Sequence, residues 1–553
     1  MFPALLLCGV LAAGQSAEPA PNPAGPTRPA SPTDVSPQPV PGPAPAAPAT
    51  NPLDSPAAAP ARVTASDMPS PAQPPVAGPN GPPALPKDPL SLVAAEEVQA
   101  PAQEAAISLP ASLFPSPSDQ ASAPKAPAKE YRRAMPSPWN SPPIPGSEYQ
   151  GYPIIGVPPD YYMWPVMKLL QGTYVGDALA SQRIRFYGWV TGEVNMSSSR
   201  NSNTPESYWI RPNTIDMDQV IFRFERTEDT VQTDHIDWGF RSTLLYGIDY
   251  RYTTAGGWFS DQLLKHNSLY GWDPTEQYFD LYVPWVAQGM VVRIGRWIAC
   301  PDIETQFAPD NYMGSHSILF TFDTYTQTGV MLTFKLSDQW TFQAAVHSGT
   351  DMAPWYKGSL FTPAAGIRWV SKDNNNAFYG WLNAINSAEF RRFDQYGQPM
   401  GHDNFNYMVG TWEHRFNPLL VTKTEAYMMW QRNAVLGGTP SAGPIKQFGG
   451  GGGIGPDITG VTETFGVLNY TIWQLGKKDF LTFRNEWWRD TDGERSGFPS
   501  TYTSNAIGLT HNFTPNFQVR PEIDYFRSWN TPAFDNGHRK NEFMLATDFT
   551  LRF

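Results

Sequence analysis

The chain contains no run of about eighteen or more apolar residues, the length that signals a membrane-spanning helix. This lack excludes a helical membrane protein. Cysteine is nearly absent: Cys8 lies in a predicted leader, which leaves Cys300 alone and no intramolecular disulfide expected. Basic residues do not dominate either. The net charge is −12, whereas a nucleic-acid binder presents a basic face, so no nucleic-acid partner is expected.

Signals for catalysis, metals and cofactors are also missing. The eight histidines are scattered, and none stands three or four residues from another in the spacing that suits zinc. The glycines at 449–453 lack the Lys-Ser or Lys-Thr that a phosphate loop requires, and the chain has no Gly-x-Ser-x-Gly elbow. We therefore predict no enzyme, no cofactor and no metal site. A lipase-type barrel is the weakest alternative, since His235, His347, His414 and His511 have no recognisable motif partner.

Aromatic residues are plentiful at 13% of the chain, while apolar residues reach only 41%. This combination is typical of a β-barrel with a polar interior and aromatic girdles at both membrane interfaces.

The first third of the chain is built differently from the rest. Residues 1–17 contain an apolar run and predict a signal peptide. Residues 18–147 hold 35 of the 57 prolines, and because proline lacks the amide donor and fixes φ, they predict an extended, disordered linker. The alternative for this stretch is an arm that touches peptidoglycan or another partner.

Residues 148–182 are a predicted transition segment with a short helix at 177–182, and residues 183–553 carry recurring strand patterns. Sixteen strands are expected near 183–196, 217–227, 235–247, 277–285, 289–298, 327–336, 340–348, 364–371, 377–386, 405–416, 419–431, 461–473, 479–490, 501–513, 517–528 and 541–553. Short links follow the even-numbered strands, with a modest one after the second, and longer links follow the odd-numbered ones. This rhythm is typical of an outer-membrane barrel, with both chain ends on the periplasmic side. The predicted fold class is all-β: a closed antiparallel transmembrane β-barrel of about 16 strands after a disordered Pro/Ala-rich arm.

The last strand, Phe543 to Phe553, alternates apolar and polar residues and ends the chain on an aromatic. It resembles the closing strand of bacterial outer-membrane barrels, and this resemblance implies that Phe553 is an assembly signal read by the barrel-assembly machinery. An edge strand of a soluble sandwich is the alternative.

Several segments resemble the β-barrel porin-2 (OmpL-like) family of bacterial outer-membrane porins. They are Arg185 to Val190, Asp237 to Asp249 with its Tyr-Gly-x-Asp ending, and the Arg-x-Gly-Arg strand at Val291 to Arg296. Glu304 to Tyr312 and Thr328 to Val330 fit the same pattern, whereas Cys300-Pro301 departs from it. The resemblance covers roughly 148–553 with gaps, and it implies a pore for small solutes.

Strand parity indicates which charges face the interior. A lipid-facing Arg at mid-bilayer costs about 2–4 kcal/mol, so charges on the polar face of each strand should line a wet lumen. The predicted lumen-lining residues are Arg185, Glu193, Arg223, Glu225, Arg241, Arg293, Arg368, Arg520, Glu522 and Asp524. Ladders that only stiffen the wall are the alternative reading.

The stretch Ala299 to Ser317 carries Asp302, Glu304 and Asp310 between two strands. If it folds inward, its carboxylates form a constriction that selects ions by charge. An external loop with solvated carboxylates is the alternative.

We predict an outer-membrane porin for passive diffusion of small polar solutes or ions, with a periplasmic N-terminal arm and with outer-membrane lipid around it. Peptidoglycan contact and a homo-oligomer are compatible with this reading. The alternative function is an envelope-anchoring or loop-display barrel whose arm contacts the cell wall.

Overall fold

The computed structural model describes residues 133–134, 136–138, 148–149, 151–159, 162–206, 208–259, 268–299, 301–356, 359–383, 392–393, 398–399, 406–437 and 456–553. All of them belong to one compact unit, Ala126–Phe553. The signal peptide and nearly all of the Pro-rich arm lie outside the described residues, so both stay predictions.

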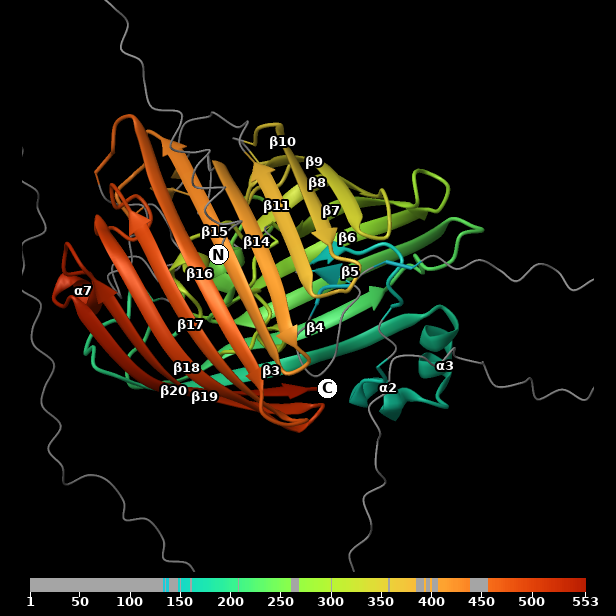
Figure 1. Cartoon of the computed structure of the whole chain (residues 1–553), viewed down its shortest axis with the longest axis horizontal. Coiled ribbons are helices and arrows are strands. Elements are labelled where there is room, and N and C mark those ends of the chain that lie inside the picture. Colours follow the sequence, from blue (N-terminus) through green and yellow to red (C-terminus); the bar gives the residue numbers. More distant parts are fainter. Residues whose placement is uncertain are drawn as a thin grey trace, which may run out of the picture. The chain divides into compact units, whose positions relative to one another are not determined.

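Sixteen strands close into an antiparallel barrel (Figure 1), which confirms the predicted fold class. The strands are β3 (Ile184–Ser197), β4 (Ile215–Arg226), β5 (Asp237–Gly247), β6 (Gly271–Val283), β7 (Met290–Ile298), β8 (Thr326–Lys335), β9 (Trp340–Thr350), β10 (Thr362–Val370), β11 (Asn376–Asn383), β14 (Asn406–Asn417), β15 (Leu420–Arg432), β16 (Val461–Gln474), β17 (Asp479–Asp490), β18 (Ser500–Thr514), β19 (Phe517–Ser528) and β20 (Asn541–Arg552). Each pairs with its neighbours in chain order, and β20 closes the ring on β3, with Leu551 opposite Val190.

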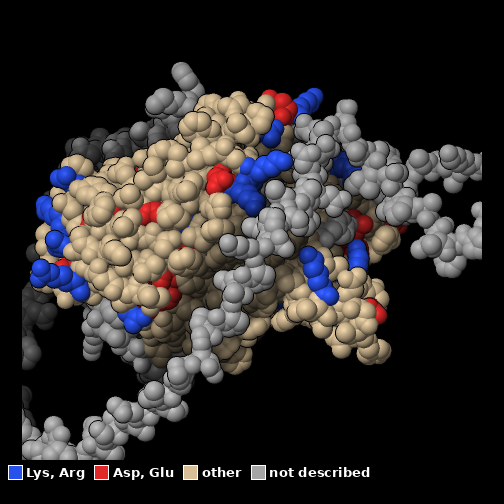
Figure 2. All heavy atoms as spheres, turned by 90° about the horizontal axis from the view of Figure 1, so that it is seen from below, with Lys and Arg blue, Asp and Glu red and all other residues tan. Residues whose placement is uncertain are grey.

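The two faces of the wall differ in the way that the sequence alternation requires. On β20, Phe543, Leu545 and Leu551 are 46–52% exposed, whereas the intervening Asp548 and Thr550 are buried inside. Successive side chains of a strand point to opposite faces, so a period of two places apolar groups outside and polar groups inside. In the face shown in Figure 2, a broad part of the wall carries few charged side chains, while Lys and Arg lie at the left end and again toward the right.

The links also alternate as predicted. At one end of the barrel the links are short, as at 336–339, 418–419 and 515–516, and at the other end they are long, as at 299–325 and 433–460.

Strand β6 differs from the prediction, because it begins at Gly271 rather than near 277. The cause is Pro274, which has no amide to donate and interrupts the strand pattern. The structure accommodates it where the register between β5 and β6 shifts, since Thr243 pairs with Glu276 but Leu245 with Asp273. A bulge of this kind leaves one residue outside the ladder.

The segment before the barrel is ordered at several points. A two-residue hairpin, β1 (Glu148–Tyr149) with β2 (Tyr152–Pro153), precedes helices α2 (Pro165–Leu170) and α3 (Tyr174–Ser181). Helix α3 begins three residues before the predicted helix, because the Thr173 hydroxyl accepts a hydrogen bond from the Gly176 amide and caps the first turn. Among the described residues, no helix is both long and apolar enough to cross a membrane.

The remaining elements are short and lie in the links. They are α4 (Tyr250–Thr253), η2 (Ala308–Asp310), α6 (Ile318–Thr321), β12 (Arg392–Phe393), β13 (Gln398–Pro399) and α7 (Phe534–Gly537).

Candidate functional site in the barrel interior

Basic and acidic side chains alternate on the inner face where β3, β4, β5 and β6 lie side by side. Glu225 accepts hydrogen bonds from Arg185 at 2.5 Å and from Arg241 at 2.8 Å. Arg223 pairs with Glu276 at 2.8 Å. Glu276 was missed from the sequence because the predicted strand began one residue later. Since an unpaired buried charge is strongly destabilising, this ladder fixes the orientation of each of its members.

A second ion pair lies at β6 and β7. Arg293 is 1% exposed and binds Asp280 at 2.7 Å, with its guanidinium 3.6 Å from the centre of the Tyr278 ring. The same guanidinium donates to the carbonyl of Gly151. The segment before the barrel therefore reaches the inner face of the wall.

We call residues 151–157 the N-terminal insert. The ring of Tyr152 lies 5.7 Å from that of Tyr379 and 5.2 Å from that of Trp381, both on the inner face of β11. Ile155 is buried beside Tyr282 at the end of β6. The insert thus packs inside the barrel, which the prediction of a simple transition segment did not anticipate.

The link between β7 and β8, residues 299–325, also lies against the inner face, and we call it the inner loop. The carboxylate of Glu304 accepts hydrogen bonds from the Ser317 amide at 3.0 Å and from the Tyr470 hydroxyl of β16 at 2.6 Å. The amide of Ile303 donates to Glu425 of β15 at 2.8 Å. These bonds attach the inner loop to the wall on the side opposite to β7.

Arg520 of β19 joins the inner loop to the wall most directly. It is 1% exposed, pairs with Asp548 of β20, and donates to the carbonyls of Ala308 and Asn311, both at 2.8 Å. A guanidinium has five donors in a fixed fork, so one Arg can hold a carboxylate and two loop carbonyls together.

The next inward residues along β19 bind the same loop. Glu522 accepts from the Ser315 amide at 2.7 Å, and Asp524 accepts from the Ser315 hydroxyl at 3.2 Å. Asp524 also accepts from Arg484 of β17 at 3.2 Å. Three of the predicted lumen residues, all on β19, are therefore brought together by the inner loop.

The remaining predicted residues are spread over the interior. Glu193 is 1% exposed and accepts from Asn195 at 3.3 Å, and Arg368 is 5% exposed beside a small cavity near β11 and β14. Asp302 of the inner loop is buried and Asp310 is half-buried. Within the described ranges, no three His, Cys, Asp or Glu side chains are arranged to hold a metal.

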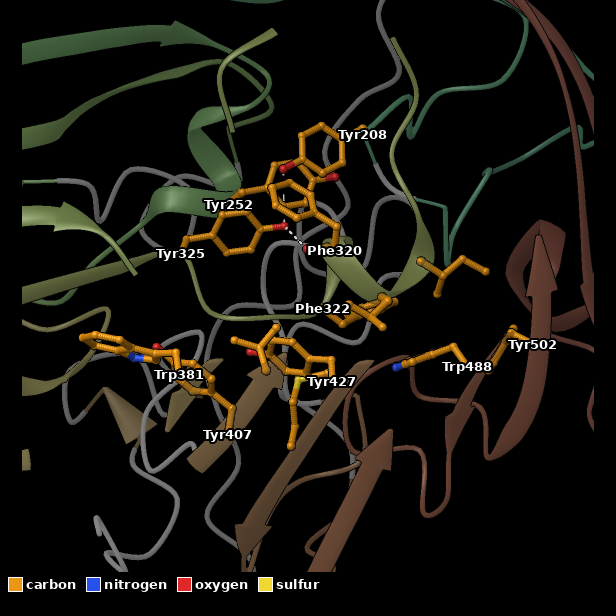
Figure 3. Packing of buried hydrophobic residues seen from close by; sticks show 14 of the residues in the cluster. Tyr208, Tyr252, Phe320, Phe322, Tyr325, Trp381, Tyr407, Tyr427, Trp488 and Tyr502 are labelled. Atoms are coloured by element: carbon orange, nitrogen blue, oxygen red, sulfur yellow. Dashed lines mark hydrogen bonds between the residues drawn. The ribbon is translucent and has the colours of Figure 1, made fainter. Parts of the chain in front are cut away.

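An aromatic cluster occupies the space between three long links, and sequence reasoning missed it. The ring of Tyr208 stacks on those of Tyr252, at 3.9 Å, and His316, at 3.8 Å. Tyr325 donates its hydroxyl to the Phe320 carbonyl at 2.6 Å (Figure 3). The five residues come from three links, one each from the first two and three from the inner loop, and they follow no periodic pattern, so the sequence carried no signal that they would meet.

Burial controls the ionisation of the inner loop. It raises the pKa of Glu304, although Arg484 and the bonds from Ser317 oppose this. Burial also lowers the pKa of His316 well below its usual value, helped by Arg484 and Arg520. Glu304 lies 3.8 Å from His316, yet desolvation outweighs the attraction.

The chain end lies at the seam where the barrel closes. The amide of Phe553 donates to the carbonyl of Gly188 at 2.9 Å, and the Gly188 amide donates to the carbonyl of Phe553 at 3.2 Å. The Phe553 ring lies 5.9 Å from that of Phe222 on β4. Whether this residue is an assembly signal stays a prediction.

The sequence profile of one family, described as "Putative beta-barrel porin-2, OmpL-like", matches residues 183–553. The chain belongs to this family of β-barrel porins. The match begins one residue before β3 and ends at the last residue of the chain, so it covers the barrel and leaves out the arm and the N-terminal insert.

Solved structures with a similar chain trace are also porins and channels. The anion-selective porin from Comamonas acidovorans is 9% identical at a TM-score of 0.42, over 67% of this chain and 99% of that one. The in-vitro folded OmpT of Vibrio cholerae is 9% identical at a TM-score of 0.40, over 67% of this chain and 99% of that one. The outer membrane channel DcaP of Acinetobacter baumannii is 9% identical at a TM-score of 0.40, over 67% of this chain and 97% of that one. At these scores they carry no conclusion about this chain. No curated protein matches the sequence.

Proposed function

We propose that the protein is an outer-membrane porin through which small polar solutes or ions diffuse passively, with its N-terminal arm in the periplasm. The observation that carries the proposal is that the chain belongs to a porin family and forms a closed barrel, with an apolar outer face and charged side chains inside. A barrel of this kind satisfies all its backbone hydrogen bonds and can therefore cross a bilayer. The ten inward residues predicted from the sequence are proposed to line the solute path.

The inner loop is proposed to set selectivity. It places Asp302 and Glu304 within the barrel, and the Arg484 guanidinium lies 3.9 Å from the Glu304 carboxylate. Fixed charges of both signs at the inner loop create a local field, which acts on the charge and dipole of a solute that passes beside the loop.

The packing also supports a second candidate function, an envelope-anchoring barrel that conducts poorly. The inward charges Arg293, Arg520 and Asp524 are at most 1% exposed, which is far less than a wide aqueous pore would give them. In this case the arm would contact the cell wall while the barrel holds it in the membrane.

Planar-bilayer recording separates the two functions. We expect the full chain and the chain lacking residues 1–147 to give discrete conductance steps of similar size. Heat-modifiable migration on gels should first establish that each barrel is folded. If both folded proteins fail to conduct while the full chain co-sediments with peptidoglycan, the pore is refuted and anchoring is supported.

A further inference from the structure

A row of three asparagine side chains crosses the outer face of the barrel. Asn469 of β16 is directly opposite Asn485 of β17, and Asn485 is directly opposite Asn505 of β18. The burial of each strand alternates, and all three residues belong to its outer set, with Asn485 and Asn505 exposed. Directly opposed side chains of neighbouring strands lie about 5 Å apart, so the three carboxamides form one continuous row.

The row lies within the apolar part of the wall. Asn485 stands midway along β17, between the outward Phe483 and Trp487, which are 38% and 41% exposed. On the strands beside it, Val467 and Ile507 are 38% and 39% exposed. Hydrocarbon offers no hydrogen-bond partner, so a carboxamide at this height needs a partner from protein.

Other outer carboxamides find that partner in their own barrel. Asn469 donates to the Thr424 hydroxyl at 2.8 Å. On the wall at β5 and β6, Gln277 accepts from the Ser242 hydroxyl at 2.9 Å and donates to the Thr243 carbonyl at 3.2 Å.

Asn485 and Asn505 differ from these. Within the described part of the chain, the side chain of neither makes a hydrogen bond. Two adjacent carboxamides are therefore left facing outward without partners, in a belt of exposed apolar side chains.

We propose that the outer face of β16–β18, centred on Asn485 and Asn505, is the interface through which two copies of this chain associate in the membrane. Copies inserted with the same orientation hold the row at the same depth. A carboxamide has both donors and an acceptor, so the row complements itself and needs no second kind of protein. Polar side chains of this kind hold membrane segments together, while the flanking Trp487, Phe483 and Ile507 supply packing. The proposal is independent of which solutes pass through the barrel.

The test measures oligomeric state and contact position together. Full-length protein extracted from membranes in mild detergent should behave as an oligomer by light scattering. The double variant Asn485→Leu/Asn505→Leu should raise the protein concentration at which half of the oligomer dissociates, by about tenfold or more. The matched control Gln277→Leu removes an outer carboxamide at the far wall and should leave association unchanged. Because Leu suits a lipid-facing site, both variants should keep heat-modifiable migration.

Cross-linking gives a second readout that does not depend on the strength of association. In a Cys300→Ser background, a bifunctional thiol reagent should join copies carrying Asn485→Cys and should not join copies carrying Gln277→Cys. A wild-type protein that stays monomeric at all concentrations would overturn the proposal. So would a double variant that associates like the wild type, or cross-linking through position 277 instead of 485.

Discussion

Replacing Arg520 by Met tests whether the interior is packed or open to water. Arg520 is 1% exposed and holds Asp548 of β20 together with two carbonyls of the inner loop. Removing one partner of a buried ion pair costs about 3–5 kcal/mol, because the other charge is left without compensation. A solvated pair contributes only about 0–1 kcal/mol. We therefore expect Arg520→Met to lower the free energy of unfolding by about 3–5 kcal/mol.

The assay is reversible urea unfolding in lipid vesicles, followed by tryptophan fluorescence. The double variant Arg520→Met/Asp548→Leu removes the stranded carboxylate and should recover a large part of the loss. Arg527 lies on the same strand on its outer side, half-buried, and Arg527→Met is the matched control with an expected change below about 1 kcal/mol.

Conductance gives the functional side of the same experiment. Without Arg520, the wall no longer holds the inner-loop carbonyls of Ala308 and Asn311, so Arg520→Met should conduct more than the wild type in planar bilayers. A stability loss below about 1 kcal/mol would refute the reasoning, since Arg520 would then be solvated as in a wide aqueous pore. An unchanged conductance in a strongly destabilised barrel would show that the inner loop does not limit the solute path.

Three further outcomes are expected. Deleting Phe553 should lower the free energy of unfolding in vitro by at most about 1.5–3 kcal/mol. A fall in the outer-membrane level of the protein that is much larger than this loss explains, measured by immunoblotting, indicates recognition of Phe553 by the assembly machinery. An unchanged level contradicts such recognition. Gly188→Ala should destabilise the pairing of β3 with β4 by about 1–3 kcal/mol in urea, because the new Cβ would lie 1.9 Å from the Ile221 carbonyl oxygen. Gly192→Ala on the same strand should not, since the nearest atom to its Cβ would be 3.4 Å away. Burial lowers the pKa of His316, so its contribution to stability is present above a pH of about 6.5 and is lost as the pH falls. His316→Phe should therefore weaken the acid dependence of the urea midpoint between pH 8 and 5, and an identical pH profile would contradict this.

The barrel could be predicted because its wall separates two phases. A strand between lipid and a polar interior must alternate with period two over its whole length, and sixteen such segments are visible in the sequence. The same rule placed Arg223 and Glu225 of β4 inside, where the structure has both buried. It failed at β6, where Pro274 interrupts the pattern and a bulge restores it.

The contents of the barrel were decided by tertiary structure alone. The inner loop, the N-terminal insert and the aromatic cluster are irregular segments, and their contacts join residues far apart in the chain, such as Glu304 with Tyr470. Irregular backbone imposes no period on side chains, so nothing in the sequence distinguishes a loop that folds inward from one that faces water. The sequence could thus name Asp302 and Glu304 as candidates. It could not show where their segment binds, because only closure of the wall brings β15–β20 opposite β7 and provides the inner surface that the segment contacts.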